Sequence, residues 1–239
     1  ITGAGVALDA ATRGYSVALV EREDFAAGTS SRSSKLVHGG LRYLQNFDLG
    51  LVREALLERA LLVKLAPHIV KPLPFVVPTF GGKRPDRVLG MGLNMYDVMS
   101  WRRGRDESED WSPERHRTIP GDEVVKLIPA LAKREPNAGY LFYDCQTDDS
   151  RLVLTVLGEA ERFGTVMANG VEVTELCEED GKASGVKAKD VHSGDEFEIR
   201  ADTVVNATGV WADRIRPEEL HDEAEVPRIR PSRGTHITL

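Results

Sequence analysis

The first twenty residues place a small-residue helix directly before a short apolar strand. Small and apolar residues recur from Thr2 to Arg13, which favours a tightly packed helix, and Gly14 follows where a helix would stop. Residues Tyr15 to Glu21 then form an apolar run that ends in an acid. Such a run is typical of a buried parallel strand. The pattern therefore predicts an α/β unit at the amino-terminal side.

The middle of the chain predicts two helices and two strands. Asp48 can cap a helix that stops before Pro67, and Asp148 and Asp149 can cap a second one from Arg151 to Phe163. The strands are expected at 75–80 and 139–144. In the first helix we expect a solvated face made by its charged residues, which are Arg53, Glu54, Glu58, Arg59 and Lys64. Residues 91–101 are apolar at helical spacing, which favours core or subunit packing over a membrane-surface patch.

The last third of the chain is β-rich. Short strand-like runs at 170–176, 183–192 and 196–200 are separated by Asp180-Gly181 and by Ser193 to Asp195, which predicts antiparallel hairpins. An apolar strand from Thr203 to a tight turn at Gly209 is expected next. Asn206-Ala-Thr also fits a glycosylation sequon, which a reduced cytosolic protein would not use.

Composition narrows the class of protein. The chain has 239 residues, 41% of them hydrophobic, and a formal net charge of -7. No global positive field therefore recruits nucleic acid, and no apolar run reaches the roughly 20 residues that span a bilayer. Cys145 and Cys177 lie far apart without metal-ligand spacing. We therefore expect a cytoplasmic protein with reduced thiols and no metal site.

The first helix–strand unit carries half of a phosphate-binding fingerprint. Gly3 fits the third glycine, which allows close packing of helix on strand, and Glu21 fits the acid that accepts a ribose hydroxyl. The first strand and two further glycines would then lie before Ile1, so we expect the chain to be a fragment. The alternative is a helix that merely contains glycines, followed by an ordinary strand.

A polar loop and a glycine pair follow this unit. The loop from Gly28 to Lys35 combines hydroxyls with two cations and contains no carboxylate, so it suits an oxyanion. The adjacent Gly39 and Gly40 let the backbone approach a flat ligand. A flexible serine-rich surface loop is the alternative, although it would have little use for His38, Arg42 and Tyr43.

Three runs, at 2–14, 28–35 and 38–44, together resemble the FAD-dependent glycerol-3-phosphate dehydrogenases, and the match continues through 52–60 and 72–77. The resemblance implies an α/β fold: a Rossmann-like FAD-binding domain of the two-dinucleotide-domain flavoprotein type, with a small antiparallel β-meander and the start of a mixed-sheet substrate domain. Residues 1–72 and 147–215 would form the two parts of the FAD-binding domain. Residues 73–146 would begin the substrate domain, and 216–239 would return into it.

The resemblance also implies a set of site residues. FAD would be bound by residues of both FAD-domain parts, namely Gly3, Gly5, Glu21, Thr29, Ser30, Ser31, Arg32, Ser33, His38, Gly39, Gly40, Val173, Ala207, Thr208 and Gly209. Within this set Val173 would offer backbone contacts to the adenine. Arg42 and Tyr43 would hold the substrate with Arg233 and His236, and His236 would act as base or orienting group. Asp148 to Val153 also match the family, and we interpret their acids as helix caps.

The implied reaction is oxidation of sn-glycerol 3-phosphate to dihydroxyacetone phosphate, by hydride transfer from C2 to flavin N5. The electrons would pass to a quinone, or to oxygen in oxidase relatives, and the fragment itself would be inactive. Two rivals stay open: an amino-acid or hydroxy-acid oxidase of the same fold, and a non-enzymatic or RNA-directed flavin-binding protein. The net negative charge argues against an RNA partner. Membrane contact at the inner face and a homodimer also stay open.

Overall fold

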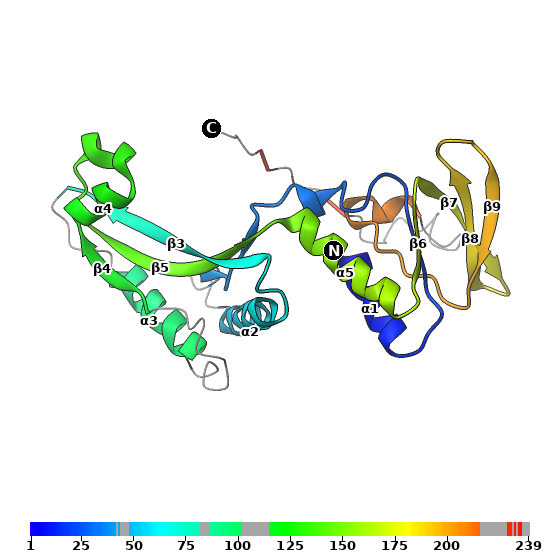
Figure 1. Cartoon of the computed structure of the whole chain (residues 1–239), viewed down its shortest axis with the longest axis horizontal. Helices are drawn as coiled ribbons and strands as arrows, with labels where there is room; N and C mark the ends of the chain where they lie inside the picture. The colour runs from blue at the N-terminus through cyan, green and yellow to red at the C-terminus, as the bar shows by residue number, and fades with distance from the viewer. Residues whose placement is uncertain are drawn as a thin grey trace. The chain divides into compact units, whose positions relative to one another are not determined.

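The computed structural model describes residues 1–41, 43, 48–81, 87–101, 115–215, 229–230, 232 and 234–235. The chain forms two compact units (Figure 1). Unit 1 comprises Ile1–Ser34 and Asp149–Leu239, and unit 2 comprises Lys35–Asp148.

Unit 1 contains the predicted helix–strand pair. Helix α1 (Thr2–Thr12) ends before Gly14, whose φ of 87° suits glycine, and β1 (Ala18–Glu21) follows. β1 pairs in parallel with β6 (Val166–Asn169), so that Glu21 lies opposite Asn169 at its end. α5 (Asp149–Arg162) lies beside α1 in Figure 1, and Ala4 packs with Val153 and Leu157. The prediction of a parallel strand that ends at Glu21 is confirmed, but its predicted burial is wrong, because Ala18 is exposed and the other three residues are only half-buried.

The predicted antiparallel meander is present in unit 1. It consists of β7 (Val171–Glu179), β8 (Lys182–Asp190) and β9 (Glu196–Arg200), paired in sequence order. Asp180 and Gly181 have φ values of 51° and 71°. Two consecutive residues with positive φ are what a two-residue hairpin turn requires, so the turn signal in the sequence was sufficient here.

The predicted strand at 203–209 is wrong. Residues 203–208 form no regular element, and a 3-10 helix, η5 (Gly209–Arg214), follows them. Within the described ranges no strand offers this segment backbone hydrogen bonds, so its apolar pattern alone does not make it a strand. The Asn206 side chain instead donates to the carbonyls of Ala212 and Ile215, both at 2.9 Å. The turn itself is as expected, since Gly209 has a φ of 59°.

Unit 2 is built around a central antiparallel strand, β5 (Ala138–Thr147). It pairs with β2 (Leu36–Val37), β3 (Val70–Thr79) and β4 (Arg117–Pro120). β3 contains Pro72, Pro74 and Pro78, which an edge strand tolerates because one side of it needs no ladder bonds.

The helices of unit 2 are α2 (Leu49–Leu65), α3 (Arg87–Trp101), α4 (Gly121–Leu127) and the 3-10 helix η4 (Pro129–Arg134). Asp48 caps α2 as predicted, because its side chain accepts a hydrogen bond from the Leu51 N–H at 3.1 Å. Arg53, Glu54, Glu58 and Lys64 are exposed as predicted, but Arg59 is only 3% exposed. The assignment of Arg59 to a solvated face is therefore wrong.

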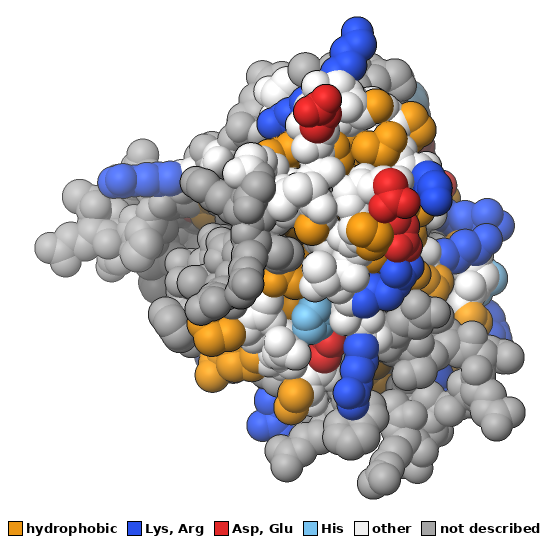
Figure 2. Space-filling view, turned by 90° about the vertical axis from the view of Figure 1, so that its left-hand side faces the viewer, with side chains coloured by type: hydrophobic (Ala, Val, Ile, Leu, Met, Phe, Trp, Pro, Cys, Tyr) orange, Lys and Arg blue, Asp and Glu red, His pale blue; other side chains and the backbone are white. Residues whose placement is uncertain are grey.

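On the face of the molecule shown in Figure 2, lysine and arginine side chains are interspersed with acidic and hydrophobic ones. This face shows no single-sign patch among the coloured residues.

In α3, Leu93 is fully buried, whereas Met91 and Val98 are exposed. The apolar spacing at 91–101 therefore serves partly the core of unit 2.

The boundaries between the compact units differ from the expected domain boundaries. The expected breaks were at 72/73 and 146/147, and the units divide at 34/35 and 148/149. The first difference arises because β2 pairs with β5, which draws the segment from Lys35 onward into unit 2. The functional roles given to the four segments stay predictions.

Candidate functional site

In unit 1 the start of α1 collects several of the predicted cofactor residues. The Ile1 amino group donates to Ser30 Oγ at 2.8 Å, which brings η1 (Thr29–Ser31) to the helix start. A Cβ on Gly3 would lie 3.4 Å from Ala207 Cβ. Gly3 therefore brings α1 close to the segment that precedes η5. By contrast, a Cβ on Gly5 would have no neighbour within 4 Å.

Glu21 lies close to this helix start. Its Oε1 accepts a hydrogen bond from the Glu23 N–H at 3.0 Å. The Glu21 carboxylate is close enough to the Ile1 nitrogen to interact with it electrostatically. Arg22 then pairs with Glu172 at 3.4 Å, which ties the end of β1 to the strand that carries Val173.

The hydroxyl-rich loop meets a carboxylate that its own sequence lacks. Ser33 donates to Asp149 Oδ2 through its backbone N–H at 3.2 Å and through its Oγ at 2.8 Å. Asp149 is buried, and its Oδ1 accepts the Ser150 N–H at 3.0 Å. The expectation that no carboxylate competes for these donors is wrong, because α5 supplies one. Asp149 thus fastens the loop to α5 besides serving the helix start.

The rest of the loop is held by local contacts. Ser31 Oγ donates to the Gly28 carbonyl at 3.4 Å, and the Arg32 N–H donates to the Thr29 carbonyl at 3.0 Å. A Cβ on Gly28 would lie 3.0 Å from Trp211, so the loop lies against η5. Thr208 Oγ1 donates to Asn206 Oδ1 at 2.7 Å. The loop and the Ala207–Gly209 turn thus lie in one region of unit 1.

In unit 2 the glycine pair has both of its N–H groups bonded. The Gly39 N–H donates to Asp144 Oδ1 and the Gly40 N–H donates to His38 Nδ1, each at 3.0 Å. Because a backbone N–H can only donate, His38 Nδ1 must be the acceptor. A neutral His38 ring therefore carries its proton on Nε2.

Gly40 must be glycine for two reasons. Its φ is 72°, in the left-handed region, and a Cβ at this position would overlap the ring of Tyr43. This geometry brings Tyr43 back towards His38, and their ring centroids lie 6.4 Å apart.

A cavity of about 390 Å³ opens beside this turn, lined by Leu36, His38, Leu41, Tyr43, Phe75, Phe142 and Asp144. Phe75 and Phe142 stack on each other with centroids 5.4 Å apart. Mostly apolar walls with a few polar groups are typical of a site for a planar organic ligand.

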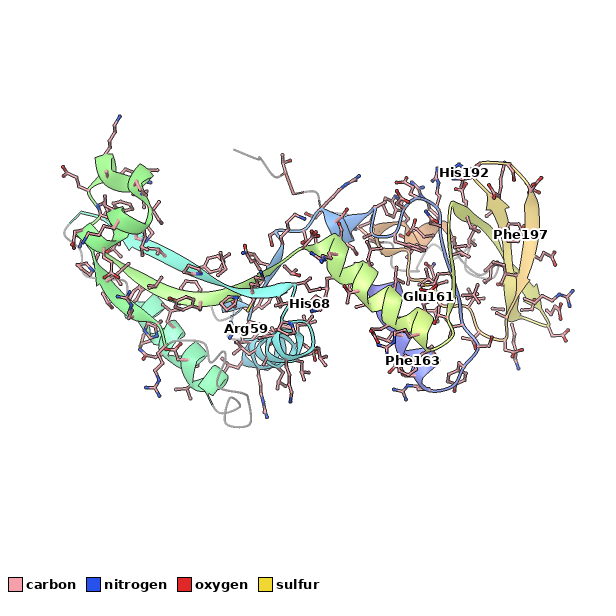
Figure 3. The ribbon with its side chains drawn as sticks, in the orientation of Figure 1. Arg59, His68, Glu161, Phe163, His192 and Phe197 are labelled. Carbon is pink, nitrogen blue, oxygen red and sulfur yellow. The ribbon has the colours of Figure 1, made fainter. Side chains whose placement is uncertain are left out.

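An ion pair that the sequence analysis missed supports the turn. Arg59, labelled in Figure 3, extends from α2 and pairs with Asp144 on β5. Both residues are nearly fully buried, at 3% and 4% exposure. The spacing of Val52, Leu56 and Arg59 along α2 puts all three on one helix face, so periodicity could have revealed Arg59.

Cys145 follows Asp144 on β5 and is fully buried. Burial raises the pKa of its thiol to about 11, although the Arg59 guanidinium acts in the opposite direction. The thiol is therefore protonated and unreactive at neutral pH. Both cysteines of the chain are free.

Arg42, Arg233 and His236 lie outside the described residues, so their roles stay predictions. Among the residues that the structure describes, no group of His, Cys, Asp or Glu could hold a metal ion. Within the same residues, no helix is both long and apolar enough to cross a membrane.

Comparison with curated proteins relates the whole chain to proteins named as dehydrogenases and oxidases of glycerol phosphate. It is 43% identical over 240 residues to a glycerol-3-phosphate dehydrogenase of Mycobacterium leprae, covering all of this chain and 39% of that protein. It is 38% identical over 243 residues to an alpha-glycerophosphate oxidase of Streptococcus pyogenes serotype M1, covering 38% of it. The chain thus spans about two-fifths of the length of these relatives.

Solved structures agree on the fold. The glycerol-3-phosphate dehydrogenase of Bacillus halodurans, solved with FAD, shares 32% identity and a TM-score of 0.64, covering 89% of this chain and 33% of that one. An L-proline dehydrogenase from P. horikoshii has the same TM-score at 19% identity, over 89% of this chain and 51% of that one, and shows the fold alone.

The family model described as FAD dependent oxidoreductase matches residues 1–239. This confirms the expected fold class and, at the level of the family, FAD as the cofactor. The chain therefore belongs to the FAD dependent oxidoreductase family.

Proposed function

We propose that this protein oxidises sn-glycerol 3-phosphate to dihydroxyacetone phosphate with FAD and passes the electrons to a quinone. The observation that carries the proposal is the 43% identity, over the whole chain, to a protein named glycerol-3-phosphate dehydrogenase. Local geometry supports it in each unit: η1 lies at the start of α1 in unit 1, and His38 and Tyr43 line one cavity in unit 2.

The residues of unit 1 fit the adenosine and diphosphate part of FAD. The tight contact of Gly3 with Ala207 leaves α1 with an N-terminus from which N–H groups can meet a phosphate. Glu21 lies nearby at the end of β1 and can accept hydrogen bonds from a ribose. Thr29, Ser30 and Arg32 supply further donors. The Ser31 and Ser33 hydroxyls donate to the Gly28 carbonyl and to Asp149, and so order the loop. Val173 offers its backbone to the adenine.

The residues of unit 2 fit the flavin ring and the reacting end of the substrate. His38 and Tyr43 line a cavity with aromatic walls, and Gly39 and Gly40 directly follow His38 in the chain. When bound, FAD accepts the hydride from C2 of the substrate. His38 can donate a hydrogen bond from Nε2 to a group in this cavity, because Nδ1 already accepts one from the Gly40 N–H.

The substrate is held by cations and hydroxyls in this proposal. Arg42 directly precedes Tyr43 and can bind the phosphate through two guanidinium N–H groups, while Arg233 and His236 complete the site. His236 accepts the proton of the C2 hydroxyl or orients it. Since the quinone acceptor is lipid-soluble, peripheral contact with the inner face of a membrane belongs to the proposal, and so does a homodimer.

The test uses the full-length protein purified with FAD. We expect reduction of a quinone analogue that depends on glycerol 3-phosphate, and production of dihydroxyacetone phosphate. Arg42→Ala should keep FAD but lower kcat/KM by about a hundredfold or more, since a charge-assisted contact contributes roughly 2–4 kcal/mol and about 1.36 kcal/mol is tenfold. Arg42→Lys should recover only part of the loss.

The control is Arg53→Ala, on the exposed face of α2, which should change little. Turnover of amino acids or hydroxy acids in place of glycerol 3-phosphate would favour the rival oxidase. Oxygen consumption without quinone reduction would show that the electron acceptor is oxygen and not a quinone, as in the oxidase relatives. Flavin binding without any turnover would favour a non-enzymatic role.

A further inference from the structure

The glycine turn leaves the sheet of unit 2 at one defined point. β2 pairs with β5 at Leu36 opposite Gln146 and Val37 opposite Cys145. Continuation of this antiparallel register would place His38 opposite Asp144. The paired strand stops at Val37, and the Asp144 carboxylate accepts the Gly39 N–H at 3.0 Å. A side chain thus holds the turn at the position where the backbone ladder ends.

The acceptor of this hydrogen bond is the buried carboxylate of Asp144, and its ion pair with Arg59 offsets the cost of burying it. Asp144 Oδ1 bonds to Arg59 Nη1, and the same nitrogen donates to the Tyr143 carbonyl at 3.3 Å. A buried carboxylate without such a partner would be strongly unfavourable. A hydrogen bond to an ionised acceptor is also stronger than a neutral one. The ion pair therefore holds the Gly39 backbone at its distance from β5 more firmly than an uncharged side chain at position 144 would.

We propose that Asp144, held in place by Arg59, is a positioning residue for the flavin-bordering turn His38–Gly40. This inference rests on the proposed function, because it takes the cavity beside the turn as the place of the flavin ring. Both His38 and Asp144 line that cavity, so a shift of the carboxylate moves the cavity wall and the His38 ring together. Asp144 acts through Gly39 and His38 and does not itself take part in the chemistry.

The experiment uses the full-length protein loaded with FAD and compares three variants. Asp144→Asn keeps an acceptor oxygen but removes the negative charge that Asp144 presents to Arg59. The double variant Arg59→Met/Asp144→Leu replaces the ion pair with apolar groups, which often preserves stability. Glu58→Gln, on the exposed side of α2 beside Arg59, is the matched control.

A positioning role and a purely stabilising role of Asp144 predict different results for these variants. We expect the double variant to melt close to the unmodified protein and to bind FAD. Its visible circular dichroism should nevertheless change, and kcat should fall by about tenfold to a hundredfold, as a misplacement of about 1 Å can cause. Asp144→Asn should show the same flavin change, with a smaller effect on KM than on kcat. Glu58→Gln should leave every readout unchanged.

Restoration of both stability and kcat by the double variant would overturn the proposal, since the pair would then only hold the fold. If the double variant does not fold, an Asp144→Asn protein with unchanged flavin dichroism and kcat would overturn it equally. Unmodified protein that binds FAD but does not oxidise glycerol 3-phosphate would refute the substrate alone, and the dichroism would still decide the role of Asp144. Unmodified protein without FAD would refute both.

Discussion

The Ser33–Asp149 contact separates two roles for the hydroxyl-rich loop. The loop sequence predicts that Ser33 binds a cofactor oxygen directly, whereas the structure bonds Ser33 to a buried carboxylate of α5. In the second case Ser33 affects FAD only by ordering the loop. Ser33→Ala, Asp149→Ala and the double variant should therefore have non-additive effects on both stability and FAD affinity.

The magnitude follows from the two hydrogen bonds. Ser33→Ala removes the Oγ bond at 2.8 Å and keeps the backbone N–H bond at 3.2 Å. A hydrogen bond to a charged group contributes about 1.5–3 kcal/mol, and the exposure of Ser33 favours the lower end. We therefore expect a coupling energy of about 1–2 kcal/mol between the two positions. Expressed as FAD affinity, this corresponds to roughly a 5- to 30-fold loss.

The assay combines urea unfolding of the FAD-free protein with titration of FAD by fluorescence. The cycle cancels the separate effect of Asp149→Ala on the Ser150 N–H, because that loss is the same with either residue at position 33. Ser34→Ala, the exposed neighbour, is the control and should change neither quantity. Additive losses of FAD affinity would show that Ser33 meets the cofactor directly, and the reasoning from the Asp149 contact would be refuted.

Three further predictions concern single positions. Gly40→Ala should lose stability by roughly 1–2 kcal/mol from left-handed strain and should also lose activity because Tyr43 is displaced. The control Gly14→Ala introduces the same strain without a steric overlap, so equal activity losses in the two variants would contradict the role of Tyr43. Burial raises the pKa of the Cys145 thiol from 9.0 to about 11 in the folded state. The resulting contribution to the free energy of unfolding is fully present below pH 9 and is lost as pH rises through 11. Cys145→Ala should therefore flatten the fall of urea stability over that range, and an unchanged slope would count against it. Glu21→Ala should weaken FAD binding by about tenfold or more, the effect of losing a charge-assisted bond, whereas Glu23→Ala should not; equal calorimetric affinities would remove Glu21 from the site.

Elements with local signals were predictable from the sequence. The Asp48 cap, the Asp180-Gly181 turn and the left-handed glycine after α1 each depend on a few neighbouring residues. Local chemistry was therefore a sufficient guide for these positions. At Gly39 and Gly40 the sequence predicted close approach to a flat ligand, whereas the turn and its positive φ at Gly40 are findings of the structure.

Long-range partners were not predictable in the same way. A charged residue on an amphipathic helix is normally solvated, and the Asp144 carboxylate on β5, a distant partner in the sequence, makes the burial of Arg59 favourable. Asp149 was interpreted as a helix cap, since its contact with Ser33 joins segments far apart in the sequence. The segment 203–208 has the composition of a strand, but pairing depends on a neighbour that local pattern does not reveal.

The most direct test of the central claim is anaerobic mixing of the FAD-loaded full-length protein with sn-glycerol 3-phosphate. The visible absorbance of oxidised flavin should disappear, with one dihydroxyacetone phosphate formed per flavin, and a quinone analogue should restore the absorbance. Flavin that stays oxidised with glycerol 3-phosphate, yet is reduced by an amino acid or a hydroxy acid, would contradict the proposed function.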